Sequence, residues 1–172
     1  MMADWIIVED YDPCWLECFQ LLSRRIAEAL GSMAAAIEHV GSTAVPNLAA
    51  KPIIDIDVVL TTLADLPAAI ERLAKIGYIH QGSLGVAGRE AFISSVKDVP
   101  HHLYVCSAGS KALEDHLAFR DYLRSHPREA KAYADLKRAL ATKFRDDRSG
   151  YVSGKTAFVA EMLSRAKNAP VE

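Results

Sequence analysis

Residues 52–60 read PIIDIDVVL, and this stretch decides how the rest of the chain is interpreted. It opens with a proline and is rich in β-branched residues, which predicts a strand. Successive side chains of a strand point to opposite faces, so Asp55 and Asp57 share one face, about 6.5–7 Å apart along the strand. The other face is apolar and carries Ile54, Ile56 and Val58. The strand therefore offers one face to a core and presents two carboxylates on the other.

The acidic face is typical of a divalent-metal site. Magnesium binds one or two protein carboxylates and completes its shell with water and substrate phosphates. Gly41 and Ser42 lie a short loop before the strand, and such a turn can bring backbone amides and a hydroxyl close to a phosphate. From the residues alone two interpretations stay open: a metal–phosphate site on Asp55 and Asp57, or an ordinary strand with a solvated acidic face.

Strands and helices are expected on both sides of this stretch. Apolar residues at helical spacing predict a helix from Trp15 to Leu30, with Asp12 as its N-cap. Further predicted elements are strands at 34–40, 78–80, 91–96 and 102–106, and helices at 66–76, 110–125, 127–144 and 149–166.

Strands thus dominate the first two thirds of the chain and helices the last third. We therefore expect an α+β fold, with a mixed or antiparallel sheet, helices mainly on one face and a C-terminal helical segment. No repeat or linker divides the sequence, so residues 1–172 are expected to form a single domain.

Composition restricts the classes of function. Of the 172 residues, 51% are apolar and 24% are charged, which is enough for a core without disulfides. The net charge of −2 argues against non-specific binding of nucleic acid or of an anionic membrane. The three cysteines (Cys14, Cys18 and Cys106) are expected to be idle thiols. The protein is expected to be soluble and cytoplasmic, because the sequence shows no signal peptide and no apolar run of about 20 residues.

Motifs along nearly the whole chain match one known family. The main ones are IEHVGSTAVP at 37–46 and LAAKPIIDI at 48–56. The others are YDP at 11–13 with Trp15, HHLYV at 101–105, HL at 116–117, FRDYL at 119–123, HP at 126–127 and GKTAF at 154–158. In this order they resemble the GrpB family, and the resemblance covers roughly residues 5–166.

The resemblance implies the polymerase beta-like nucleotidyltransferase superfold. Gly41 and Ser42 match the turn that lies on the phosphate side in that superfold, and Asp55 and Asp57 match its first two metal-binding acids. Asn47 stands where a glycine is common in the family, and asparagine tolerates the left-handed backbone that such a position requires. Active members of the superfold often carry a third carboxylate on a later strand, but the corresponding strand here, 102–106, contains no acid.

Another residue must then complete the metal site. His102 is the expected third ligand, because only one of two adjacent strand histidines can face the acids. Glu38, Glu90 and Asp98 are the alternatives. His39 either lines the site or is hydrogen-bonded within its strand.

Three cations are expected to bind nucleotide phosphates: Lys51, Arg89 and Lys155. The leading hypothesis is a nucleotidyltransferase that depends on Mg²⁺ or Mn²⁺ and uses Asp55 and Asp57 as its catalytic, metal-binding acids. The expected partners are a nucleoside triphosphate and a small-molecule or protein acceptor, without nucleic acid or membrane. The rivals are a non-catalytic nucleotide- or metabolite-binding module on the same fold, and a structural interaction domain.

Overall fold

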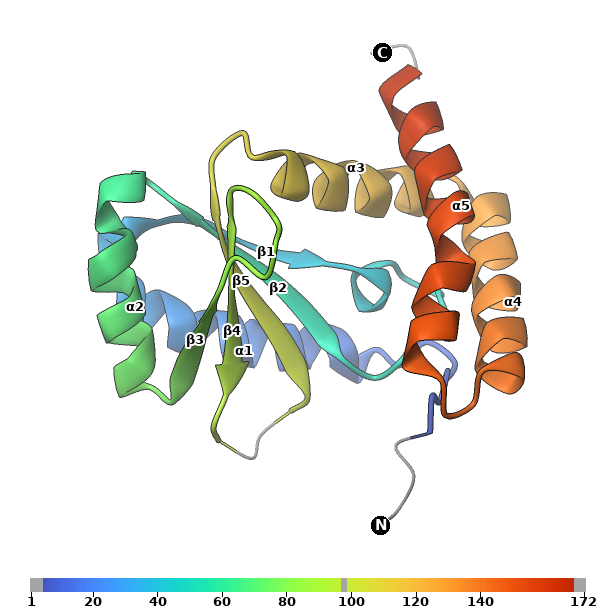
Figure 1. The fold of residues 1–172 in the computed structure, drawn as a ribbon, viewed down its shortest axis with the longest axis horizontal. Helices are drawn as coiled ribbons and strands as arrows, with labels where there is room; N and C mark the ends of the chain where they lie inside the picture. Colours follow the sequence, from blue (N-terminus) through green and yellow to red (C-terminus); the bar gives the residue numbers. More distant parts are fainter. Residues whose placement is uncertain (1–4, 97–98, 169–172) are drawn as a thin grey trace.

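The computed structural model describes residues 5–96 and 99–168, and its centre is a five-stranded mixed sheet (Figure 1). The strands are β1 (Ala34–Val40), β2 (Ile54–Leu60), β3 (Tyr78–Gly82), β4 (Arg89–Ser94) and β5 (His101–Ser107). Their order across the sheet is β1-β2-β5-β4-β3. Only the central pair, β2 and β5, is parallel; the other described pairs are antiparallel. The predicted mixed sheet is confirmed.

Five α-helices accompany the sheet in the described residues: α1 (Cys14–Leu30), α2 (Leu66–Lys75), α3 (Lys111–Ser125), α4 (Pro127–Lys143) and α5 (Arg148–Asn168). The side chain of Asp12 accepts a hydrogen bond from the amide of Cys14 at the start of α1, and Ser110 caps α3. Proline occupies the first position of α4, where a missing amide hydrogen has no cost. The α+β class is confirmed, including the C-terminal helical segment.

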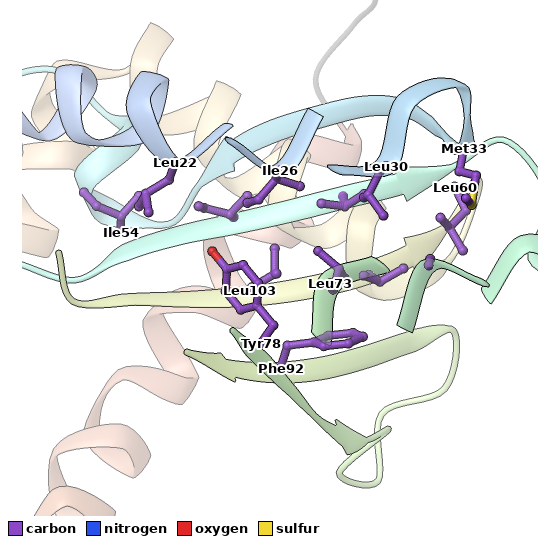
Figure 2. Packing of buried hydrophobic residues seen from close by; sticks show 14 of the residues in the cluster. Leu22, Ile26, Leu30, Met33, Ile54, Leu60, Leu73, Tyr78, Phe92 and Leu103 are labelled. Atoms are coloured by element: carbon purple, nitrogen blue, oxygen red, sulfur yellow. The ribbon is translucent and has the colours of Figure 1, made fainter. Parts of the chain in front are cut away.

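The main core lies between the sheet and helices α1 and α2. Figure 2 shows Leu22, Ile26 and Leu30 of α1 pointing at the sheet, where Ile54 and Leu60 belong to β2. These five side chains are at most 3% exposed. Each buried side chain of this size contributes about 1.5–3 kcal/mol. The apolar face of residues 52–60 is therefore the face that anchors the fold.

The opposite, acidic face is partly covered by α3, which contacts β1 and β5. Leu113 of α3 packs there with Val59 and Cys106. Helices α4 and α5 stand side by side at one end of the sheet (Figure 1). Their apolar residues enclose the loop between β1 and β2, with Val45 and Leu48 buried beside them. No helix among the described residues is long and apolar enough to cross a membrane.

Candidate functional site

Register across the sheet brings polar residues of three strands to one face. Asp55 pairs with Val40 of β1 and with His102 of β5, and Asp57 pairs with Glu38 and Tyr104. Residues that pair across a ladder point to the same side of the sheet. The two acids therefore share their face with a carboxylate, a histidine and a tyrosine, beneath α3.

Asp55 is held by the histidine beside it. The Oδ1 atom of Asp55 lies 2.8 Å from Nδ1 of His102, and the carboxylate remains 31% exposed. An ionised carboxylate only accepts hydrogen bonds, so the ring nitrogen is the donor. His101 faces the other side and bonds to the hydroxyl of Tyr78. Of these two adjacent histidines of β5, His102 is thus the one that faces the acids.

Gly41 allows the chain to pass against the Asp55 carboxylate. Its φ of +73° lies in the left-handed region, which disfavours residues with a side chain. A Cβ atom at this position would also lie 3.1 Å from Cγ of Asp55 and would overlap Oδ2. The glycine was expected to let the backbone approach a phosphate; what the structure shows is that it lets the backbone pass close to the carboxylate of Asp55.

Asp57 is in a different environment from the one expected. Either interpretation of the acidic face, a metal–phosphate site or a solvated face, would leave both acids accessible, but Asp57 is 0% exposed. Nδ1 of His116, on α3, lies 2.7 Å from its Oδ2. Burial acts to lower the pKa of His116, but the hydrogen bond and charge of Asp57 outweigh it, so the pKa is raised. The expectation was wrong for Asp57 because α3 crosses this part of the face.

Neither Glu38 nor Glu90 joins Asp55 and Asp57. Glu38 shares their face, but its Oε2 accepts a hydrogen bond from Nη1 of Arg120 at 2.7 Å. Glu90 pairs with a histidine of β3 on the opposite face of the sheet. Asp98 lies outside the described residues. Among the described residues no group of three or more His, Cys, Asp or Glu side chains is arranged to hold a metal ion.

The two aspartates nevertheless have the chemistry that Mg²⁺ needs. Oδ1 of Asp57 is buried and has no hydrogen-bond partner, an arrangement that costs free energy unless a cation or donor meets it. Magnesium requires only one or two protein carboxylates when phosphates and water supply the rest. The donor set of Asp55 and Asp57 therefore fits the ion, with His102 as a partner of Asp55.

A hollow of about 220 Å³ opens beside Asp55. It is lined by Ser42, Thr43, Ala50, Lys51, Ile53, Asp55, His102, Lys137, Arg148, Tyr151, Val152 and Lys155. The sequence-predicted residues Ser42, Lys51 and Lys155 thus gather around Asp55. Arg89 does not line this hollow; its guanidinium lies 4.2 Å from the centroid of the Tyr104 ring, and its Nε is buried without a partner.

Two cations of this hollow were not singled out from the sequence, Lys137 and Arg148. Lys137 is 2% exposed, donates to the carbonyl of Ala49, and lies 4.5 Å from the centroid of the Tyr133 ring. Burial, reinforced by Lys155 and another nearby cation, lowers the pKa of Lys137 to about 7. Spacing was the available signal, because Lys137 lies at helical intervals from the buried apolar residues Tyr133 and Leu140 of α4.

His39 belongs to the core side of this region rather than to the hollow. Its Nε2 lies 2.9 Å from Oγ1 of Thr43, and its ring stacks on Phe19 at 4.6 Å between centroids. Burial lowers the pKa of His39 to about 4, against the opposing charge of Asp55. A neutral imidazole therefore fixes the turn that follows β1.

Comparison with known proteins identifies the family. The sequence profile described as GrpB protein matches residues 5–165. The chain belongs to the GrpB family. One relative is the UPF0157 protein YqkA of Bacillus subtilis, 38% identical over 157 residues, which are 91% of this chain and 46% of YqkA. This member of the GrpB family thus spans about half the length of that relative.

Solved structures connect the GrpB family with a wider fold. GrpB from Enterococcus faecalis superimposes with a TM-score of 0.85 and 34% identity, covering 93% of this chain and 96% of that one. A chain of the GLD-2/RNP-8 complex matches with a TM-score of 0.59 and 12% identity, covering 95% and 63%. At such low identity the likeness shows the fold alone. The chain thus shares its overall fold with that protein.

Proposed function

We propose that this GrpB protein is a magnesium-dependent nucleotidyltransferase that transfers a nucleotidyl group from a nucleoside triphosphate to a small molecule or a protein side chain. The observation that carries the proposal is the pairing of two features at one place. Asp55 and the unpartnered oxygen of Asp57 lie on one face of β2, and the hollow beside Asp55 is lined by lysine and arginine. Carboxylates suit the metal, and the cations suit the phosphates.

In such a transfer the oxygen of an acceptor hydroxyl gives up its proton to water and forms a bond to the α-phosphorus, the bond from that phosphorus to the oxygen bridging the β-phosphate breaks, and pyrophosphate leaves. Magnesium held by Asp55 and Asp57 would neutralise phosphate charge. His116 and His102 orient the two carboxylates through their hydrogen bonds. Lys155 and its neighbours in the hollow would pair with the β- and γ-phosphates and stabilise the charge on the departing pyrophosphate.

A second candidate is a non-catalytic nucleotide-binding module on the same fold. It is favoured by the missing third carboxylate, because the strand that should carry it presents His102 and Tyr104 beside the acids. It is also favoured by the hydrogen bond between His116 and Asp57, which already engages one oxygen of that buried carboxylate. The two candidates share the binding step and differ in turnover.

Calorimetric titration separates these possibilities. We expect the wild-type protein to bind ATP with magnesium and not with chelator. Asp55→Asn should weaken the binding of magnesium ATP by about 100-fold or more, because it removes the carboxylate charge that would hold the cation. Two unit charges at ~4 Å interact by about 4 kcal/mol at an effective dielectric of 20. Asp135→Asn, which removes an exposed carboxylate on α4, is the matched control and should bind as the wild type does.

Equal binding by wild type and Asp55→Asn would remove the metal-site proposal. Pyrophosphate release with a panel of hydroxyl-bearing acceptors then tests turnover. Magnesium-dependent binding with no release on any acceptor would favour the non-catalytic module.

A further inference from the structure

The charged side chains that line the hollow beside Asp55 are mainly basic, which favours a negatively charged ligand. Four cations line it, Lys51, Lys137, Arg148 and Lys155, against one acid, Asp55. The ammonium of Lys137 is buried, and a carbonyl and a ring face hold it; the described residues include no carboxylate bonded to it. A buried cation without a counter-charge is costly, so an entering anion would be stabilised there.

The lining offers few groups that distinguish one nucleobase from another. Base edges are recognised by side chains that present matched donors and acceptors, above all Asn, Gln and Arg. The twelve described residues around the hollow include no amide side chain. The hydroxyl of Thr43 is engaged by His39, and that of Ser42 by Tyr133.

The aromatic rings that line the hollow do not distinguish one nucleobase from another either. Tyr151 is 2% exposed, and Nζ of Lys155 lies 4.5 Å from the centroid of its ring. The imidazole of His102 is held by Asp55 and could at most stack on a base. Stacking is tolerant of base identity, because every base has a π face. Arg148 and the lysines of the lining are the side chains that could pair with a base edge, and the edge they suit is that of guanine.

A neighbouring hollow of about 390 Å³ continues along α5 and shares Val152 and Lys155 with the first. Its other lining residues are Tyr133, Thr156, Val159, Ala160 and Leu163. A nucleoside that extended from the phosphates along α5 would meet mainly aliphatic side chains. The free energy of such contacts depends on the apolar area that is buried and not on the hydrogen-bonding pattern of the base.

We infer that the site recognises a polyphosphate chain and is indifferent to the base, so that it binds the four ribonucleoside triphosphates and inorganic tripolyphosphate alike. The inference rests on the proposed function and names its ligand class. Each added phosphate brings more negative charge to the same four cations, and Coulomb attraction grows with that charge. Affinity should therefore fall from triphosphate to diphosphate to monophosphate, by about tenfold at each step.

The test is calorimetric titration of the full chain, in excess magnesium, with ATP, GTP, CTP, UTP and tripolyphosphate. We expect the four nucleotides to agree within about threefold, and tripolyphosphate to lie within about tenfold of ATP. Lys137→Met should weaken all five by a similar factor of about tenfold. Lys131→Gln, on the exposed side of the same helix, is the control for loss of charge and should change none of them. If Lys137→Met fails to give a wild-type melting transition, Lys155→Gln serves in its place.

The outcomes separate the inference from the function on which it rests. A preference of more than about tenfold for one base would overturn the inference alone, and a preference for GTP would point to Arg148 or a lysine of the lining as the residue that reads it. Binding of ATP without binding of tripolyphosphate would overturn it as well. If none of the five ligands bound in a magnesium-dependent way, the proposed function would fall, and the inference with it.

Discussion

At the scale of single residues, Gly41 is the tightest constraint on the site. An alanine there would suffer a left-handed φ and would also collide with the Asp55 carboxylate. We expect Gly41→Ala to cost about 1–3 kcal/mol of unfolding free energy and to displace Asp55, so that magnesium-dependent triphosphate binding is lost. Denaturant unfolding and calorimetry measure the two effects.

Gly109→Ala provides the matched control for that change. Gly109 has nearly the same φ, +72°, but no atom lies within 4 Å of the added Cβ. It should therefore lose a similar amount of stability from backbone strain and keep its triphosphate binding. Equal binding losses in the two variants would show that contact with Asp55 is not the reason.

The lowered pKa of His39 predicts how the stability of the protein depends on pH. Because its pKa is lowered to about 4 in the folded protein, the unfolded chain binds a proton between pH 6.5 and 4 that the folded chain does not. The contribution of His39 to the free energy of unfolding is fully present above pH 6.5. It is lost as the pH falls through the folded-state pKa, and the loss amounts to up to about 3 kcal/mol. Urea unfolding from pH 7.5 to 4.5 should show a steeper decline for the wild type than for His39→Gln. Parallel curves would contradict the assignment.

The residues of the site differ in how well sequence could predict them. The shared face of Asp55 and Asp57 followed from the two-residue period of a strand. Lys51 and Lys155 followed from their positions, just before that strand and early in the last helix. The burial of Asp57 depends on His116, which is 59 positions away in the sequence. No local pattern encodes the distance between two such residues. Lys137 was missed for the related reason that its burial is created by packing of α4 on the loop 43–51.

At the scale of secondary-structure elements, local patterns were sufficient for type and approximate bounds. The strand expected at 53–60 is β2, and the three C-terminal helices expected at 110–125, 127–144 and 149–166 are α3, α4 and α5. The strand expected at 91–96 instead runs from Arg89 to Ser94, because pairing with β5 begins at Arg89. The placement of α3 over the acidic face could not be predicted, since it depends on which way the chain turns after β5.

The contact between α4 and α5 yields a prediction at this scale. Gly154 of α5 faces Leu140 of α4, and an added Cβ would lie 3.0 Å from Cδ1 of that leucine. Gly154→Ala gains helix propensity of about 1 kcal/mol but should lose more, about 1–3 kcal/mol, by forcing the helices apart. The double variant Gly154→Ala/Leu140→Ala should be more stable than the sum of the two single changes predicts. Additive free energies in the double-mutant cycle would exclude this contact as the cause.

At the scale of the whole molecule, the proposed ligand would join the sheet to helices α4 and α5. Asp55 comes from the sheet, Lys137 from α4 and Lys155 from α5. A ligand that contacts all three should stabilise the folded state by about 2.7 kcal/mol at a hundred times its dissociation constant. For a domain of this size that corresponds to a rise in melting temperature of about 5–10 °C.

This rise should require magnesium and triphosphate together, because each carries charge that the other neutralises in the site. Differential scanning calorimetry of the wild type with both ligands, with each alone and with neither gives the comparison. Lys137→Met should lose about half of the shift and Lys131→Gln should keep it, since only the first removes a cation from the hollow. Hydrogen exchange locates the effect: amides of both β2 and α5 should gain protection, because the ligand bridges them. Protection confined to the helices would mean that the phosphates bind without engaging Asp55, and the metal-site geometry would then be wrong.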